Sequence, residues 1–111
     1  MEKKLGKIEK VSFGLGGYQN VQLGISLTLG NGTWGVGDFK GDWDAESIKR
    51  SEYTQWTEED RSKSYDETMR YVSKLLKEAK VDSVDKLKDK PIEATFDGNT
   101  LKEWRILTEV L

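Results

Sequence analysis

The sequence predicts a single α+β domain over residues 1–111, in which an antiparallel sheet of about five strands packs with one long helix and one short helix. Three patterns predict this class. Val21–Leu29 alternates apolar and polar residues, Arg61–Lys80 has apolar residues at helical spacing, and two further alternating segments flank Asp97–Gly98. A chain of 111 residues fits one domain and leaves little room for a second.

Three strands are predicted in the first third of the chain. Lys7–Phe13 is the first, Val21–Leu29 the second and Thr33–Phe39 the third. The glycine-rich loop Gly14–Asn20 joins the first two, and Gly30–Asn31–Gly32 supplies the positive-φ positions of a tight hairpin between the second and the third. The regular alternation of the second strand is typical of an antiparallel strand with one buried face.

A long connection and the main helix follow. Asp44–Arg61 is polar and is predicted to be a connection with some helical turns, in which Ile48, Tyr53 and Trp56 are isolated anchors. Arg61–Lys80 is predicted to be a helix, with acidic residues before its start and lysines near its end, as the helix dipole favours. Its apolar stripe consists of Tyr65, Met69, Val72, Leu75, Leu76 and Ala79.

The last third is predicted to contain one helical turn and a hairpin. Val81–Leu87 is the turn, and Pro91 prevents a helix from continuing. The strands of the hairpin are Ile92–Phe96 and Thr100–Val110. On the last strand, alternation predicts two faces, one with Trp104 and Ile106 and the other with Leu101, Glu103, Arg105 and Leu107.

The residue types present exclude several kinds of chemistry. The chain has no Cys and no His, so it lacks the residues for disulfides, for thiolate or histidine metal sites and for Ser–His or Cys–His catalysis. Asp38, Asp42 and Asp44 do not have the spacing of a calcium loop, and we expect no metal and no cofactor. No catalytic constellation is recognisable, and we expect that the protein is not an enzyme.

Charge and hydropathy limit the partners. Eighteen basic and twenty acidic residues give a net charge of −2, and the signs alternate along the chain, which disfavours duplex nucleic acid. A small anionic ligand remains compatible, because one or two arginines in a pocket can hold a phosphate. The mean hydropathy is −0.71, and no apolar run approaches the ~20 residues of a membrane span. We therefore expect a cytoplasmic protein without a membrane partner.

The segment Gly32–Asp44, GTWGVGDFKGDWD, combines large rings with bare backbone. Phe39 is predicted to lie on the face opposite to Trp34 and Val36, so this strand has apolar side chains on both faces and each face must pack against another part of the protein. A helix on one face and a second subunit on the other would provide it, which predicts a homodimer or a higher homo-oligomer. A ring over glycine-floored space could also stack on a nucleobase, and a pocket at a dimer interface satisfies both interpretations. Phe39 and Trp43 are therefore candidate ligand-binding residues.

Arg105 is the candidate partner for an anion. It is predicted to share a face with Leu101 and Leu107, either as a rim residue whose stem covers apolar surface or as a buried anion clamp. Further candidates lie in loops or at the start of the helix, where polar contacts to a ligand are favoured; they are Asn99, Tyr18 and Arg61.

Two runs of the sequence resemble a known family. LGISLTLGNGTWGVGDFKGDWD, residues 23–44, and VSKLLKEAKVDSVDKLKDKPIEATFDGN, residues 72–99, are similar to patterns in small phage proteins that counter bacterial immunity. The family that they resemble is the first type of Thoeris anti-defence protein. The resemblance implies five strands with two helices, which is the set of elements predicted above.

The resemblance also implies a function, that of a molecular sponge. Proteins of that family bind cyclic ADP-ribose isomers made by immune TIR-domain enzymes without cleaving them, and some relatives also hold cyclic oligonucleotides in a higher oligomer. We therefore expect a phage-type protein in the cytoplasm of the infected cell that sequesters such a nucleotide. Phe39 or Trp43 would stack on the adenine and Arg105 would clamp the pyrophosphate, in a pocket completed by a neighbouring subunit. The alternative is a small protein–protein inhibitor of a host defence enzyme, with Trp56 and Tyr53 as anchors.

Overall fold

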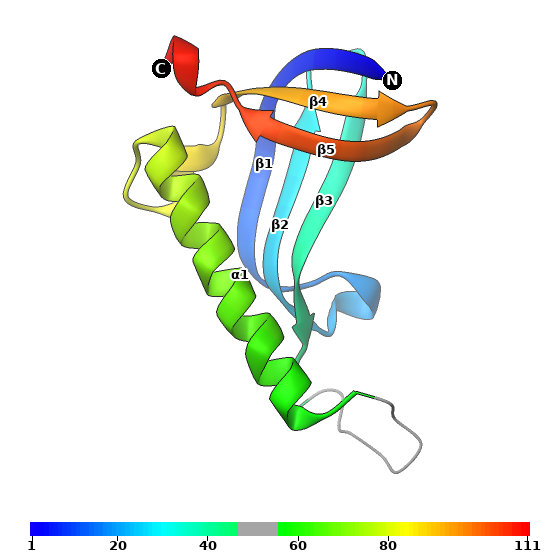
Figure 1. Ribbon diagram of the computed structural model, residues 1–111, viewed down its shortest axis with the longest axis vertical. Helices are drawn as coiled ribbons and strands as arrows, with labels where there is room; N and C mark the ends of the chain where they lie inside the picture. Colours follow the sequence, from blue (N-terminus) through cyan, green and yellow to red (C-terminus); the bar gives the residue numbers. More distant parts are fainter. Residues whose placement is uncertain (47–55) are drawn as a thin grey trace.

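The computed structural model describes residues 1–46 and 56–111 and has the predicted α+β architecture (Figure 1). The predicted residues Ile48 and Tyr53 lie outside the described residues. Within these residues, five strands are all antiparallel to their neighbours, and they accompany one long helix and three short 3₁₀ turns. In chain order the elements are β1 (Glu2–Gly16), η1 (Tyr18–Asn20), β2 (Gln22–Gly30), β3 (Gly35–Trp43), α1 (Glu58–Ala79), η2 (Val84–Leu87), β4 (Pro91–Asp97), β5 (Thr100–Ile106) and η3 (Thr108–Val110).

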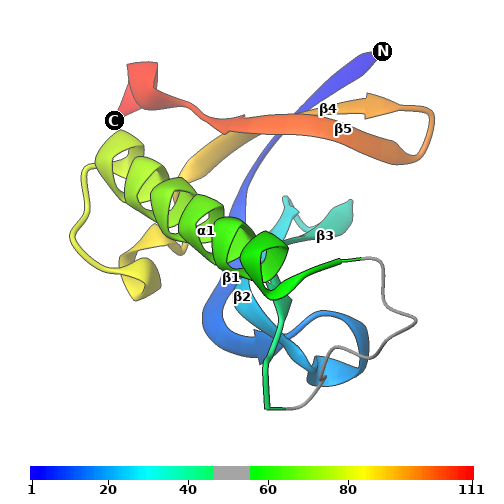
Figure 2. The ribbon, with the colours of Figure 1, turned by 60° about the horizontal axis from the view of Figure 1, so that its bottom comes forward.

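The sheet has the order β3-β2-β1-β4-β5, and β1 belongs to two ribbons. Its residues Glu2–Lys7 pair with β4, and its residues Lys7–Gly16 pair with β2. We call β4, β5 and Glu2–Lys7 the upper ribbon, and β2, β3 and Lys10–Gly16 the lower ribbon. The β4–β5 hairpin crosses the upper ends of β2 and β3, so the sheet curls, and α1 lies along the open side (Figures 1 and 2).

A β-bulge at Glu9 lets one strand serve both ribbons. Ile8 pairs with Leu29 and Lys10 pairs with Thr28, so Glu9 is an extra residue that has no counterpart in β2. The extra residue reverses the alternation of side chains beyond it. Even-numbered residues of β1 therefore face the interior before the bulge and odd-numbered residues face it afterwards.

The core lies between the two ribbons and α1. Trp34 packs edge to face on Phe96, with ring centroids 5.5 Å apart, and the Trp104 Nε1 group donates a hydrogen bond to Asp38 Oδ2 at 2.7 Å. Both contacts join the upper ribbon to the β2–β3 hairpin. The buried apolar side chains are Ile8, Ile25, Leu27, Leu29, Leu75, Ala79, Leu87, Ile92, Ala94, Phe96 and Ile106.

Helix α1 begins three residues before the predicted start. Thr57 and Asp60 form a reciprocal capping box, in which the Asp60 backbone N–H donates to Thr57 Oγ1 and the Thr57 N–H donates to Asp60 Oδ2. The predicted stripe is partly wrong, because Met69 is 52% exposed. The side chains buried along the helix are Arg61, Thr68, Leu75 and Ala79.

Several strand ends also differ from the prediction. β1 starts at Glu2 and continues through Gly16, so the predicted loop Gly14–Asn20 is strand in its first part. β3 starts at Gly35 and runs on to Trp43, and β5 stops at Ile106. Where a strand is longer than predicted, as β1 and the end of β3 are, its glycines and charged residues pair with a neighbouring strand although they have no strand signal of their own. β5 is shorter than predicted because the chain turns into η3 at Thr108. None of the described helices has the length and apolar character that crossing a membrane requires.

Candidate functional site

The outer face of the lower ribbon, which points away from α1, is lined mostly by glycines and hydroxyl-bearing residues. The pairing of the strands places these residues in cross-strand rows, because residues opposite each other in a sheet share one face. Ser12 pairs with Ser26, which pairs with Phe39. The neighbouring rows are Lys10–Thr28–Gly37, Gly14–Gly24–Gly41 and Gly16–Gln22–Trp43.

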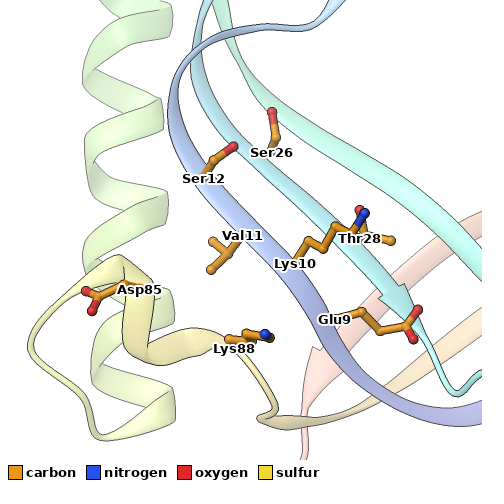
Figure 3. Close-up of a pocket in the computed structure, with 8 residues that line it drawn as sticks. All are labelled: Glu9, Lys10, Val11, Ser12, Ser26, Thr28, Asp85 and Lys88. Atoms are coloured by element: carbon orange, nitrogen blue, oxygen red, sulfur yellow. The ribbon is translucent and has the colours of Figure 1, made fainter.

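An open pocket of about 560 Å³ lies on this face at the edge of β1 (Figure 3). We call it the hydroxyl pocket. Its lining residues are Glu9, Lys10, Val11, Ser12, Ser26, Thr28, Asp85 and Lys88. Strands β1 and β2 supply the hydroxyl groups and Lys10, whereas Asp85 and Lys88 come from η2 and the residue after it.

The two charged side chains that η2 and the following residue bring to the hydroxyl pocket, Asp85 and Lys88, point in different directions. Figure 3 shows the Lys88 side chain directed toward β1 and the Asp85 carboxylate directed away from it. A hydrogen bond with Ser83 is the main cause that lowers the pKa of Asp85, so this carboxylate is ionised at neutral pH. Two lysine amines and three hydroxyls therefore face the open space, and Glu9 lies at one end of it. The arrangement suits an anion that also has hydroxyl groups.

The ring of Phe39 leans across the sheet from β3 toward β1. An ideal Cβ on Gly16 would lie 3.6 Å from Phe39 Cε2 and 3.0 Å from Ser26 Oγ. Because β2 lies between these two strands, the ring extends over the backbone of β2. Phe39 is half-buried in this position, which leaves part of an aromatic ring beside the hydroxyl pocket.

Two of the glycines on the outer face of the lower ribbon, Gly24 and Gly41, are required by the close approach of their strands. A Cβ on Gly24 would lie 2.7 Å from the Gly41 Cα atom, so β2 and β3 approach too closely there for any side chain. By contrast, a Cβ on Gly14 would meet nothing within 4 Å, and one on Gly37 would touch only the Leu27 carbonyl at 3.9 Å. Packing within the protomer therefore explains Gly24 and Gly41, but neither Gly14 of the same row nor Gly37 of another row.

Trp43 and Tyr18 meet at the lower end of the sheet. Their rings are edge to face with centroids 6.3 Å apart, and Tyr18 is 66% exposed. The Tyr65 hydroxyl of α1 donates a 2.6 Å hydrogen bond to the Trp43 carbonyl oxygen. Burial is the largest cause of the raised pKa of Tyr65, so its hydroxyl keeps the proton that it donates. The Trp43 backbone is thus fixed to the helix, and Tyr18 supplies the more accessible ring.

Arg61 is a packing residue rather than a loop residue open to a ligand. It is 3% exposed, its guanidinium lies 4.4 Å from the centroid of the Trp56 ring, and its Nη1 is 3.1 Å from Glu58 Oε2. A guanidinium over an indole face is a favourable cation–π contact. Trp56 is half-buried beneath this contact. This packing weakens the case for Trp56 as an exposed anchor for a protein partner.

Arg105 does not lie on an apolar strand face, so this part of the sequence interpretation is wrong. Glu103 pairs with Thr95 and Leu101 pairs with Phe96, so Lys102 is an extra residue that turns Leu101 to the inner face. On the outer face, Arg105 Nη1 and Nη2 donate to the two carboxylate oxygens of Glu109 at 3.0 and 2.8 Å.

These contacts engage the guanidinium of Arg105. Its Nε group also donates to Glu93 Oε1 at 3.4 Å. The hydrogen bond from Arg105 is the main cause that lowers the pKa of Glu109 to about 2, and the same bond raises the pKa of Arg105. The cation predicted to clamp a ligand thus has two carboxylate partners within its own chain.

Phe39 and Arg105 point to opposite exteriors of the protomer. Their neighbours Asp38 and Trp104 meet through a hydrogen bond in the interior, and adjacent residues of a strand point to opposite faces. Asn99 lies in the exposed turn between β4 and β5. The structure therefore gathers Phe39, Trp43 and Tyr18 on the lower ribbon. A pocket that combined Phe39 with Arg105 would need two subunits, as the sequence-based hypothesis supposes.

Sequence reasoning missed Lys10 and Lys88 as candidate cations. Ser26 and Thr28 lie on the polar face of the alternating segment Val21–Leu29, but nothing in one sequence gives the register that brings Lys10 beside them. Lys88 approaches only because η2 folds back along β1.

Within residues 1–46 and 56–111, no three acidic side chains gather in a way that could hold a metal ion. Comparison of the chain with protein-family models, with curated proteins and with solved structures finds no match.

Proposed function

We propose that the outer face of the lower ribbon binds an anionic cyclic nucleotide of the cyclic ADP-ribose class and sequesters it without cleavage. The observation that supports this proposal most is the position of the hydroxyl pocket, with Lys10 and Lys88, beside the half-buried ring of Phe39. The resemblance of residues 23–44 and 72–99 to phage anti-defence sponges gives the class of nucleotide. The place of action is then the cytoplasm of an infected cell.

The polar groups of the pocket match a pyrophosphate and its riboses. Lysine amines form charge-assisted hydrogen bonds to phosphate oxygens, and serine and threonine hydroxyls can donate to the same oxygens. Glu9 at the end of the pocket can accept hydrogen bonds from ribose hydroxyls. Phe39 offers a surface for the base, and stacking of a base on an aromatic ring contributes ~1–3 kcal/mol.

The binding experiment compares matched lysine variants. Titration calorimetry with a cyclic ADP-ribose isomer measures the affinity of the parent, of the double variant Lys10→Ala/Lys88→Ala and of Lys102→Ala, an exposed lysine of the upper ribbon. Each lost charge-assisted hydrogen bond contributes ~1.5–3 kcal/mol, so the double variant should bind at least about tenfold more weakly. Lys102→Ala should bind like the parent.

Phe39→Ala and Arg105→Ala separate two arrangements of the site. Phe39→Ala should weaken binding in either arrangement. If Arg105→Ala weakens binding and the double lysine variant does not, the cation comes from a second subunit, as the sequence-based hypothesis states. Absence of binding by the parent protein would overturn the proposed function and favour the direct inhibitor of a host protein.

Recovery of the ligand tests sequestration itself. After the complex is heated to denature the protein, chromatography should return the intact nucleotide. A cleaved product would instead make the protein an enzyme.

A further inference from the structure

Strand β1 has an edge without a partner strand among the described residues. Its pairing with β4 ends where Lys7 meets Pro91. Ile8 then closes this side, because its N–H donates to the Lys90 carbonyl at 3.0 Å and its carbonyl accepts from the Asp89 N–H at 2.7 Å. In the part of the chain that the structure describes, Lys10–Gly16 pairs with β2 and with no other strand. We call Lys10–Gly16 the free edge.

The free edge has few of the features that protect sheet edges from pairing. Monomeric proteins usually protect such edges with charged residues, proline or bulges. The sequence here is KVSFGLG, in which the only charge is Lys10 at one end. The preceding half of the same strand contains Glu2, Lys3, Lys4 and Lys7. The two halves of β1 therefore differ in how well they would accept another strand.

Apolar side chains are exposed along the inner side of the free edge. Phe13 is 41% exposed and Leu15 is 58% exposed, because α1 packs mainly on β3 and leaves this part of β1 uncovered. Met69 of α1 is also exposed, and a cavity of about 240 Å³ lies between it, Phe13 and Leu23. A strand added to the free edge would cover these apolar groups.

We propose that a second copy of the chain pairs with this free edge, antiparallel and about a two-fold axis at Phe13. In this register Phe13 faces Phe13 of the partner subunit, Val11 faces the partner's Leu15, and Ser12 faces the partner's Gly14. All seven residues of the free edge are paired. A two-fold axis at Ser12 would instead bring Leu15 and Gly16 against Glu9 and Ile8 of the partner subunit, where Lys90 and Asp89 already occupy the edge.

The same register is chemically self-complementary. The inner side of the joined strands contains only apolar pairs, which is the arrangement that stabilises a sheet. On the outer side, Lys10 faces the partner's Gly16 and no like charges are opposed. Because residues 14 and 16 are glycines, the partner strand brings only backbone to the part of the hydroxyl pocket beside Lys10 and Ser12. This explains why Gly14 is bare although a Cβ there would meet nothing within its own protomer.

The dimer would also change the binding face, a consequence that rests on the proposed function. The partner's Lys10 would lie beside Gly16, the position that the Phe39 ring approaches. Each Phe39 would then have a cation from the neighbouring subunit, and the two outer faces would form one surface. The pairing of the edges does not depend on this consequence.

A cysteine cross-link tests the register, because the native chain has no Cys. Residues directly opposite in an antiparallel pair have Cα atoms about 4.5–5.5 Å apart, within disulfide range. Phe13→Cys should therefore form a covalent dimer under mild oxidation. Ser12→Cys is the matched control, since the two Ser12 Cα atoms would be about 8 Å apart, beyond disulfide range. Equal cross-linking of both variants, or of neither, would overturn the register.

Light scattering tests the edge without a cross-link. The parent protein should have twice the monomer mass of 12.7 kDa at micromolar concentration. Phe13→Lys should be monomeric and Leu5→Lys, which changes an exposed residue of the charged half of β1, should remain dimeric. Circular dichroism confirms that both variants are folded. A monomeric parent, or a dimeric Phe13→Lys, would overturn the proposal while leaving the affinity of Lys10→Ala/Lys88→Ala as a separate test of the binding site.

Discussion

The two ribbons of the sheet share strand β1 but have different outer faces. On the upper ribbon a group of charges is paired, since Arg105 contacts both Glu93 and Glu109, and Glu93 also lies 4.0 Å from Lys3. On the lower ribbon, among the described residues, Lys10 has no ion pair and its neighbours are hydroxyls and glycines. The arginine of the upper face thus has partners within the protomer, whereas the lysine of the lower face lies in an open pocket where it can bind a ligand.

The inner faces differ in the same direction. In the upper ribbon Ile92, Ala94 and Phe96 are buried between the ribbons. In the lower ribbon Phe13 and Leu15 remain exposed beyond α1. One helix of 22 residues cannot cover the whole concave side of a curled sheet. The buried residues of β2 belong to the same core as the upper ribbon, so the exposed part of the lower ribbon is its β1 edge. This edge is the part available for a second subunit.

The largest expected effect is at the junction of the two ribbons. Ile8 is fully buried where β1 passes from one ribbon to the other, so Ile8→Ala leaves a cavity that both ribbons share. We expect a loss of ~2–5 kcal/mol in the free energy of unfolding. Urea denaturation followed by tryptophan fluorescence measures it. Leu5→Ala, at an exposed position of the same strand, should change stability by less than about 0.5 kcal/mol, and equal losses would contradict the comparison.

A smaller effect is expected where β2 and β3 approach closely. In Gly24→Ala the new methyl group would lie 2.7 Å from the Gly41 Cα atom, so the two strands must separate. Overpacking of this kind costs ~1–3 kcal/mol. Gly37→Ala is the matched control on the same face, because its methyl group meets only ordinary contacts, and it should be neutral or stabilising by up to ~1 kcal/mol. Thermal melts of both variants measure these changes in stability. If Gly24→Ala is as stable as the parent protein, close packing of β2 and β3 is not the reason for the glycine.

The sequence predicts the ribbons better than it predicts their faces. The alternation of Val21–Leu29 and the helical spacing of Arg61–Lys80 identify their elements, because each pattern reports burial along one local segment. The bulges at Glu9 and Lys102 have no local pattern, since an extra residue is defined only by the partner strand. Simple alternation therefore places Leu101 on the wrong face, and predicts apolar surroundings for Arg105 that it does not have.

The candidate site was predictable only in part for a related reason. Phe39 was identified because a ring on the strand face opposite to Trp34 and Val36 is visible in the sequence. Lys10 and Lys88 were missed because they are 78 positions apart by their residue numbers and meet only through the fold of η2 along β1. Residues that line a pocket across such a separation share no spacing that a sequence pattern can report.

The smallest expected effect on stability is that of the Arg105–Glu109 pair. The pKa of Glu109 also reports which ribbon supplies the cation for the ligand. The hydrogen bond from Arg105 holds the pKa of Glu109 near 2, so the pair favours folding above the ordinary glutamate pKa, and this contribution is lost as the pH falls toward 2. The pair is exposed, so the effect on stability is slight. Carbon-detected NMR should show the low pKa of Glu109 in the parent protein and an ordinary value in Arg105→Ala.

The same titration in the presence of ligand distinguishes the two candidate cations. If Lys10 and Lys88 hold the nucleotide, saturating cyclic ADP-ribose isomer leaves the Glu109 titration unchanged. If Arg105 leaves Glu109 to clamp the pyrophosphate, the pKa of Glu109 rises on binding, and the upper ribbon is part of the site.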